Sequence, residues 1–344
     1  MKKYILAITF LIISPLAYNQ IIRGTVMDKE TKDPVSFAAV YFDGTSIATY
    51  TDDKGSFRLD TKKNLSKPLT ISALGYYSIN IQEYSPNNDV LAYLVPKVFE
   101  IKDVIVNAKG NPYIRKQNLA VFKREFLGRT GNAEECEIIN EDDIRFITSP
   151  GQDTLKAYSI KPVFIVNKGL GYKITYYLNK FEYIKSRYLC QLIGNSIFNE
   201  DTASATDRQN YEIRRNRAYL GSKMHFIRSL WQDDLKAEGY VVKNLKRQIS
   251  YKELVRHQLS VDPGGSKKNI YYSEPIPVTL SVKWEPGKAE SGMEILRNNI
   301  FFDETGYYQG PGIIWYGEMA KQGIADLLPY DYQPSEKTKT VRLF

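Results

Sequence analysis

The chain has 344 residues, of which 43% are hydrophobic and 25% are charged, and its formal net charge is +8. This composition supports packed cores and excludes a disordered polyelectrolyte, and the modest charge gives no reason to expect a nucleic-acid partner. Two isolated histidines cannot make the usual three-ligand open zinc site unless carboxylates from distant segments complete it. No cofactor is therefore expected, and the length predicts two domains.

Residues 1–19 are predicted to be a signal peptide. Two lysines precede the apolar run Tyr4–Leu16, which is too short for a spanning helix of about 20 residues. Cleavage is expected between Ala17 and Gln20, and an uncleaved anchor is the alternative. No later stretch is long and apolar enough to span a bilayer. We therefore expect a periplasmic, outer-membrane-associated or secreted protein.

Residues 20–109 are predicted to form an all-β Greek-key sandwich. Short alternating or apolar runs are separated by turn residues such as Asp43-Gly44 and Asp52–Gly55. They give about seven strands, at residues 22–26, 35–41, 47–51, 57–59, 69–73, 77–81 and 90–95. Asp52 and Asp53 offer too few oxygen ligands for calcium, so this segment is interpreted as a turn.

The same segment carries a recognisable set of residues: Gly24-x-Val26-x-Asp28, then Thr51-Asp52-x-x-Gly55-x-Phe57, then Leu74-Gly75-Tyr76. It resembles the carboxypeptidase regulatory-like domain, a transthyretin-like sandwich found in many proteins of the Gram-negative envelope. The resemblance covers only the N-terminal quarter of the chain. It implies a β-sandwich that does not itself cut peptides.

Residues 110–344 are predicted to form an α+β domain with an antiparallel sheet and several helices. Helical spacing predicts a helix over 114–127 and another over 211–220. Ser222 is expected to cap a helix that reaches Glu238, and a last helix is expected over 315–328. Strands are expected within 136–198, with a turn at Asn179-Lys180, and again over 241–249, 251–259, 278–282 and 295–302.

Two further stretches, residues 217–230 and 324–332, resemble parts of uncharacterised envelope proteins that pair this sandwich with a downstream α+β region. That resemblance implies a shared architecture and no activity.

The chain shows no recognisable catalytic motif. His225 lies on a predicted helix and His257 on a predicted strand, and neither belongs to a zinc-binding or nucleophile motif. Acidic pairs such as Glu134-Glu135 and Asp233-Asp234 usually face water. No catalytic, cofactor or metal residue is therefore assigned. Cys136 and Cys190 form a possible disulfide, and the alternative is that they are small buried side chains.

A basic segment from Arg208 to Arg228 is the best candidate surface for an anionic ligand. Because a helix turns 100° per residue, Arg214 and Arg217 share a face and Arg215 is offset. We expect Arg228 to reach in from the next helix. The alternative is a solvated helix face whose arginines pair with nearby carboxylates.

These features predict an exported, non-enzymatic binding or assembly protein of the cell envelope. The sandwich would be its docking module, and the C-terminal region would face an envelope protein or a glycan. One alternative is a hydrolase of glycans or peptides with an unrecognised site in residues 110–344. Another is an anion-binding accessory protein that uses the Arg208–Arg228 surface.

Overall fold

The computed structural model describes residues 20–61, 67–82, 84–85, 87–97, 111–148, 151, 153–201, 205–258 and 267–335. The predicted signal peptide and the segment expected to join the two domains lie outside these residues. Within the described part of the chain, no helix is long and apolar enough to cross a membrane.

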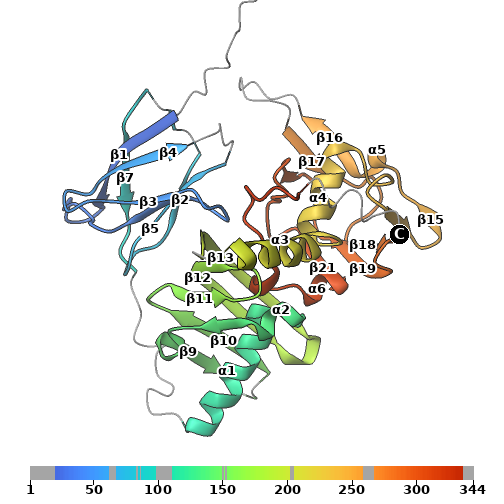
Figure 1. Ribbon diagram of the computed structural model, residues 1–344, viewed down its shortest axis with the longest axis horizontal. Helices are drawn as coiled ribbons and strands as arrows, with labels where there is room; N and C mark the ends of the chain where they lie inside the picture. Colours follow the sequence, from blue (N-terminus) through green and yellow to red (C-terminus); the bar gives the residue numbers. More distant parts are fainter. Residues whose placement is uncertain are drawn as a thin grey trace, which may run out of the picture.

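The N-terminal region is a sandwich of two sheets around its own apolar core (Figure 1). One sheet has the order β4-β1-β7 and the other the order β3-β2-β5-β6. The strands are β1 (Gln20–Asp28), β2 (Ala39–Phe42), β3 (Ala48–Tyr50), β4 (Ser56–Thr61), β5 (Leu69–Ser72), β6 (Ile79–Ile81) and β7 (Val90–Leu94). The predicted seven-stranded β-fold is confirmed.

The recognisable residues of this region build its turns. The carboxylate of Asp28 accepts the backbone N–H groups of Glu30 and Thr31 and the hydroxyl of Tyr76. Asp52 accepts two backbone N–H groups of its own turn, at 2.9 and 2.8 Å. Gly55 has φ +71°, and a Cβ there would lie 2.5 Å from the carbonyl oxygen of Val26. The motif is therefore structural, and Asp52 belongs to a turn.

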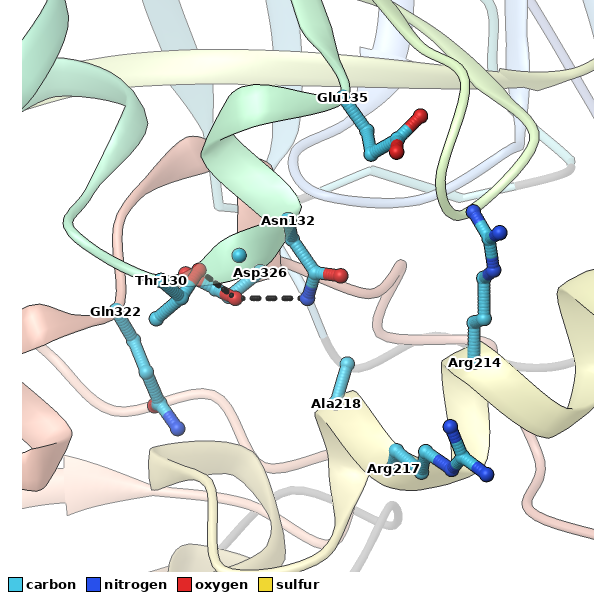
Figure 2. Close-up of a pocket in the computed structure, with 9 residues that line it drawn as sticks. Thr130, Asn132, Glu135, Arg214, Arg217, Ala218, Gln322 and Asp326 are labelled. Carbon is cyan, nitrogen blue, oxygen red and sulfur yellow. Dashed lines mark hydrogen bonds between the residues drawn. The ribbon is translucent and has the colours of Figure 1, made fainter.

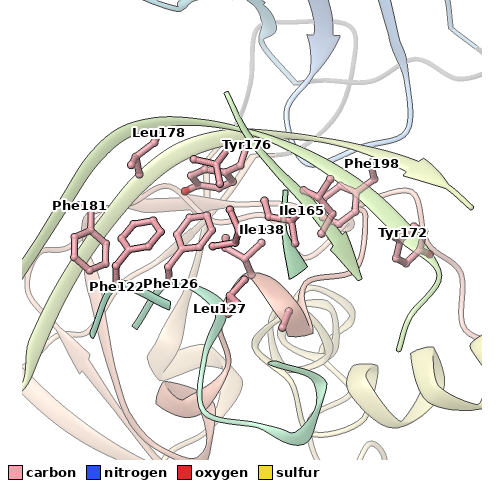
Figure 3. Close-up of a cluster of buried hydrophobic side chains, with 14 of the residues drawn as sticks. Phe122, Phe126, Leu127, Ile138, Ile165, Tyr172, Tyr176, Leu178, Phe181 and Phe198 are labelled. Atoms are coloured by element: carbon pink, nitrogen blue, oxygen red, sulfur yellow. The ribbon is translucent and has the colours of Figure 1, made fainter. Parts of the chain in front are cut away.

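The C-terminal region begins with α1 (Pro112–Leu127), which packs on a six-stranded antiparallel sheet. Figure 3 shows the buried side chains of this cluster, among them Phe122 and Phe126. Asn111 caps the helix by accepting the Tyr113 N–H, and Phe122 and Phe126 are fully buried against the sheet. The strands are β8 (Cys136–Ile138), β9 (Ile144–Thr148), β10 (Thr154–Ser159), β11 (Val163–Asn167), β12 (Tyr172–Ile184) and β13 (Leu189–Glu200).

Two smaller sheets enclose a second core. Their orders are β15-β14-β18-β19-β21 and β16-β17-β20. The strands are β14 (Tyr240–Asn244), β15 (Arg247–Gln248), β16 (Val255–Gln258), β17 (Lys267–Ile270), β18 (Val278–Trp284), β19 (Ala289–Ile295), β20 (Ile300–Phe302) and β21 (Ile313–Gly317). The helices after α1 are α2 (Gly131–Glu134), α3 (Ala205–Tyr219), α4 (Lys223–Gln232), α5 (Tyr251–Leu254) and α6 (Glu318–Lys321). The predicted α+β class is confirmed.

The turn predicted at Asn179-Lys180 is wrong. The strand β12 continues through these residues, and the register against β13 shifts between Leu178 and Lys180, which marks a β-bulge. The chain reverses instead at residues 185–188, where Tyr188 takes a left-handed conformation. A polar pair in a long strand therefore gave the same signal as a turn.

The helix that begins after Ser222 is shorter than predicted. Ser222 accepts the His225 N–H as expected, but the helix ends at Gln232 because Asp233 adopts φ +57°. The expected strand over 251–259 is likewise half helical, since α5 occupies residues 251–254 and β16 begins at Val255.

The helix predicted over 315–328 is also wrong in its first part. Trp315 lies in β21, where it pairs with Met293 of β19, and its indole N–H donates to the Tyr308 hydroxyl at 2.8 Å. The strand ends at Gly317, where φ is +66°. Glycine is required there because a side chain would meet the carbonyl of Glu290. Within the range predicted as one helix, α6 and a short 3-10 helix, η4 (Ile324–Asp326), follow.

Candidate functional site

Arg214 and Arg217 lie exposed on α3 and line one groove. The groove has a volume of about 430 Å³, which falls within the range of small-ligand sites. It is formed by three segments far apart in the sequence. Its lining consists of Thr130, Gly131, Asn132, Glu135, Arg214, Arg217, Ala218, Gln322 and Asp326. The predicted shared face of Arg214 and Arg217 is thus present.

The floor of the groove is fixed by Asp326. One carboxylate oxygen of Asp326 accepts the Thr130 hydroxyl at 2.7 Å and the Asn132 amide at 2.9 Å (Figure 2). The other oxygen accepts the Gly323 N–H at 3.2 Å. Burial raises the pKa of this carboxyl, and the hydrogen bonds from Thr130 and Asn132 oppose the shift. Asp326 therefore joins η4 to the segment around α2.

The two arginines of the groove are available to a ligand. Neither Arg214 nor Arg217 forms a hydrogen bond or ion pair with any residue that the structure describes. Figure 2 shows both arginines on α3, across the groove from Thr130 and Asn132. In the same view, the Glu135 carboxylate lies above the groove. Such a site combines cationic groups with several neutral donors and acceptors.

Arg228 does not belong to this surface, and its predicted role there is wrong. Its guanidinium is buried, with 7% of the residue exposed, and donates to the carbonyl oxygens of Thr305, Tyr330 and Tyr332 at 3.0–3.2 Å. Three backbone acceptors hold it in the interior because a buried guanidinium must be satisfied. It ties α4 to the last described segment of the chain.

Arg215 is buried as well. It donates to the carbonyl oxygens of Leu170 and Gly171 and pairs with Glu200 at 2.8 Å. Its guanidinium also lies 4.0 Å from the ring centroid of Tyr172. The predicted alternative, in which arginines of this segment pair with nearby carboxylates, therefore holds for Arg215.

Lys223 lies behind the groove, where burial lowers its pKa to about 8 and Asp326 opposes the shift. Its ammonium donates to the Gln322 carbonyl.

The disulfide between Cys136 and Cys190 is excluded. Both thiols are free. Across the sheet, Cys136 is opposite Asn167, which is opposite Tyr172, whereas Cys190 is opposite Tyr183. The eleven-residue offset along β12 corresponds to roughly 35 Å, far beyond the ~7 Å limit between bonded Cα atoms. Burial raises the pKa of both thiols to about 12, so neither is poised as a nucleophile.

The histidines do not form a site. His225 is buried, its Nδ1 accepts the Gly221 N–H at 3.1 Å, and its Nε2 lies 2.9 Å from the Glu238 carboxylate. His257 lies on β16, exposed, beside the Tyr251 hydroxyl. Among the residues that the structure describes, no group of three metal-binding side chains is arranged to hold an ion.

The sequence pointed to only two of the residues that line the groove. Glu135 was noted as half of an acidic pair, Asp326 lay in a stretch whose resemblance implies no activity, and Thr130, Asn132 and Gln322 carried no signal. These residues meet only because η4 packs against α2 and α1. No local pattern reports such a contact.

The comparison with family models supports the resemblance seen in the sequence. Residues 22–106 match the model described as the CarboxypepD_reg-like domain. This quarter of the chain is therefore a carboxypeptidase regulatory-like β-sandwich module. No curated protein matches the chain.

Proposed function

We propose that this protein is an exported, non-enzymatic binding protein of the Gram-negative cell envelope, and that its groove binds an acidic glycan. The carrying observation is the pair Arg214 and Arg217, exposed and unpaired among the described residues, in a groove otherwise lined by polar groups. A sugar carboxylate pairs with the guanidinium groups.

The other lining residues favour a hydroxyl-rich ligand. Asn132, Gln322 and Glu135 supply amide and carboxylate groups that suit sugar hydroxyls. Ala218 is the one apolar side chain in the lining of this groove. An apolar ligand would therefore gain little from burial there.

The sandwich takes no part in the groove itself. It contributes none of the lining residues of the groove, and it contacts β13 through its turn at residues 43–46. We assign it the part of a docking module that positions the C-terminal region in the envelope. Its turn at residues 43–46 is already occupied by contacts within this chain.

Export is tested by fractionating native cells and sequencing the N-terminus of the recovered protein. We expect the protein in the envelope or medium with its first 17 to 19 residues removed. Intact protein in the cytosol would contradict the proposed location.

Ligand binding is tested by calorimetry with polygalacturonate as probe and dextran as the neutral control. Binding of polygalacturonate should weaken steeply as salt rises and should be lost in an R214S/R217S variant. The matched control is R23S/R58S, which removes two exposed arginines from the sandwich. Equal losses in both variants would indicate a non-specific charge effect and contradict the site.

A reducing-end assay with the same glycan separates binding from hydrolysis. Glu135 and Asp326 are two carboxyl groups that line one groove, and glycosidases act with a pair of carboxyl groups. Asp326 already accepts three hydrogen bonds, so it is poorly placed to deliver a proton. New reducing ends from the glycan, lost in E135Q, would establish the hydrolase alternative instead.

A further inference from the structure

One set of hydrogen bonds joins the sandwich to the C-terminal region at the edge of β13. The Gly44 N–H donates to the Ser196 carbonyl at 2.8 Å, and the Phe198 N–H donates to the Thr45 carbonyl at 3.0 Å. The Ser196 N–H donates to the Asp43 carboxylate at 2.7 Å. The turn between β2 and β3 thus adds a short parallel bridge, Thr45 to Ile197, to the large sheet.

The last described segment of the chain closes the junction from another side. The Tyr330 N–H donates to the Gly44 carbonyl at 2.6 Å, and the Ser46 hydroxyl contacts the Asp331 carboxylate at 2.5 Å. We call these contacts and those at β13 the junction.

The apolar part of the junction is small. Its separate cluster has three buried members, Ala39, Tyr41 and Ile197, with Ala48 and Tyr177 packed beside them. The Tyr41 and Tyr177 rings are stacked with centroids 5.7 Å apart. The sandwich core and the two C-terminal cores are distinct clusters. A polar junction between separate cores is the kind that permits relative motion of two regions.

A lysine is buried in the junction without a hydrogen-bond partner. Lys67 belongs to the sandwich and is 6% exposed. Among the described residues, its ammonium is the buried side-chain group left without a partner. It lies 3.5 Å from the ring centroid of Tyr330 and 5.2 Å from that of Tyr307, both in the C-terminal region.

We propose that the junction opens reversibly and that the buried ammonium of Lys67 is the group that favours opening. Closure takes this charge out of water and places it between two aromatic rings without a hydrogen bond. Desolvation of an unpaired charge opposes closure. Opening returns Lys67 to water and frees the edge of β13.

The charged and titratable groups around Lys67 come from every part of the junction. They are Asp43, Asp303, Asp331, Arg228, Tyr84, Tyr307 and Tyr330. Burial lowers the pKa of Lys67 to about 8, and the Asp303 carboxylate is the strongest of the groups that oppose the shift. The pKa values of Tyr84, Tyr307 and Tyr330 are raised, so the three phenols stay neutral up to pH 9.

The sign of the pH effect follows from the two states of Lys67. The closed junction holds the proton less tightly than the open one, where the ammonium regains its ordinary pKa near 10.5. Closure is therefore least favoured below pH 8 and becomes more favourable between pH 8 and 10.5. Between pH 7 and pH 9 the closed-to-open ratio should rise about tenfold.

Hydrogen exchange of individual amides measures this opening. The amides of Ser196, Phe198 and Tyr330 donate across the junction, whereas the amides of β11 and β12 report the core of the large sheet. In the full chain, protection factors of the junction amides should rise about tenfold from pH 7 to pH 9, after correction for intrinsic exchange. Lys223 titrates in the same pH range, but it faces Asp326 in the C-terminal region and lies outside the junction. The amides of β11 and β12 therefore serve as the control for its effect.

A substitution isolates the contribution of Lys67. K67M removes the charge while keeping the length and apolar body of the side chain, so junction protection at pH 7 should increase and its pH dependence should vanish. The matched control is K54M, which removes an exposed lysine of the same sandwich and should change neither quantity.

Two results would overturn the proposal. One is a wild-type junction whose protection stays constant or falls from pH 7 to pH 9. The other is a K67M variant with intact core protection but weaker junction protection. That result would mean that the contact of the ammonium with the Tyr330 ring stabilises the closed junction. If K67M fails to fold, the wild-type pH series alone decides the question.

Discussion

The sandwich and the C-terminal region differ in how far apart in sequence their contacts lie. In the sandwich, Asp28 and Asp52 bond to backbone groups two to four residues away, within the turns that carry the recognisable motif. In the C-terminal region, Thr130 bonds to Asp326 and Asn167 bonds to the Ala325 carbonyl. Local signals therefore define the sandwich, whereas distant contacts define the C-terminal region.

The two regions also bury different groups. The sandwich core consists of apolar side chains on alternating strand positions, as in the exposed–buried pattern of β4, and the charged side chains that the described part of the sandwich buries are Asp28 and Lys67. The interior of the C-terminal region also holds Arg215, His225, Arg228 and Asp326, each with hydrogen-bond partners. Buried polar groups rely on specific partners, so substitutions there should have effects that apolar patterning does not reveal.

The largest expected effect is in the core of the large sheet. Phe122→Ala removes a fully buried ring that stacks on Phe126 and contacts Phe181 at a tilt, both with centroids 4.8 Å away. Unfolding in urea should show a loss of ~3–5 kcal/mol. The control Tyr188→Ala removes an aromatic side chain that is 82% exposed and should be nearly neutral. Because the cores are separate, hydrogen exchange of the β1 and β4 amides should not change. An equal loss of protection at these amides would contradict the independence of the two regions.

The next effect distinguishes the buried arginine from the exposed ones. Arg228→Met leaves three carbonyl oxygens without their donor and should reduce the free energy of unfolding by ~2–4 kcal/mol. Arg214→Met is the control, since that side chain is exposed on α3, and should change it by less than ~0.5 kcal/mol. Similar stability of the two variants would show that Arg228 is not a structural tie.

These two substitutions illustrate what the sequence could predict. The helix spacing that places Phe122 and Phe126 on one face was sufficient, because the side chains that define it lie within one helix. Arg228 looked like an extension of the basic surface, because its acceptors follow 77 to 104 residues later. The sequence also placed Arg214 and Arg217 together, but the groove around them depends on η4 and α2.

The segment from Trp315 to Leu328 shows the same limit. Its apolar spacing is compatible with a helix, yet pairing of Ile313–Gly317 with β19 decides the structure. Strand pairing with a distant partner overrides local propensity. The seven strands of the sandwich could be predicted because turn residues bound short segments that are too short for helices.

A smaller effect tests the local character of the sandwich. Gly55→Val introduces a side chain at φ +71°, where its Cβ meets the Val26 carbonyl, and should cost ~2–3 kcal/mol. The control Gly75→Val has φ +82° but no atom within 4 Å of the added Cβ, so it should cost less. Both are measured by thermal unfolding of residues 20–106, which we expect to unfold cooperatively. A Gly55→Val fragment as stable as the parent would contradict the role of this turn.

The smallest expected effect concerns the two thiols. Because Cys136 and Cys190 are free and lie at opposite ends of β12, adding a reductant should leave the urea midpoint of the full chain unchanged. A disulfide across the intervening chain would contribute about 4 kcal/mol, and its reduction would lower the midpoint clearly.

The mass of the unfolded, alkylated protein provides the second measurement. Without reductant, it should show both cysteines modified, whereas a shift of the midpoint together with two unmodified cysteines would mean that the order of strands around β12 is wrong. That result would also contradict the long-range contacts by which the C-terminal region differs from the sandwich. Phe122, Phe126 and the floor of the groove all pack on the same sheet.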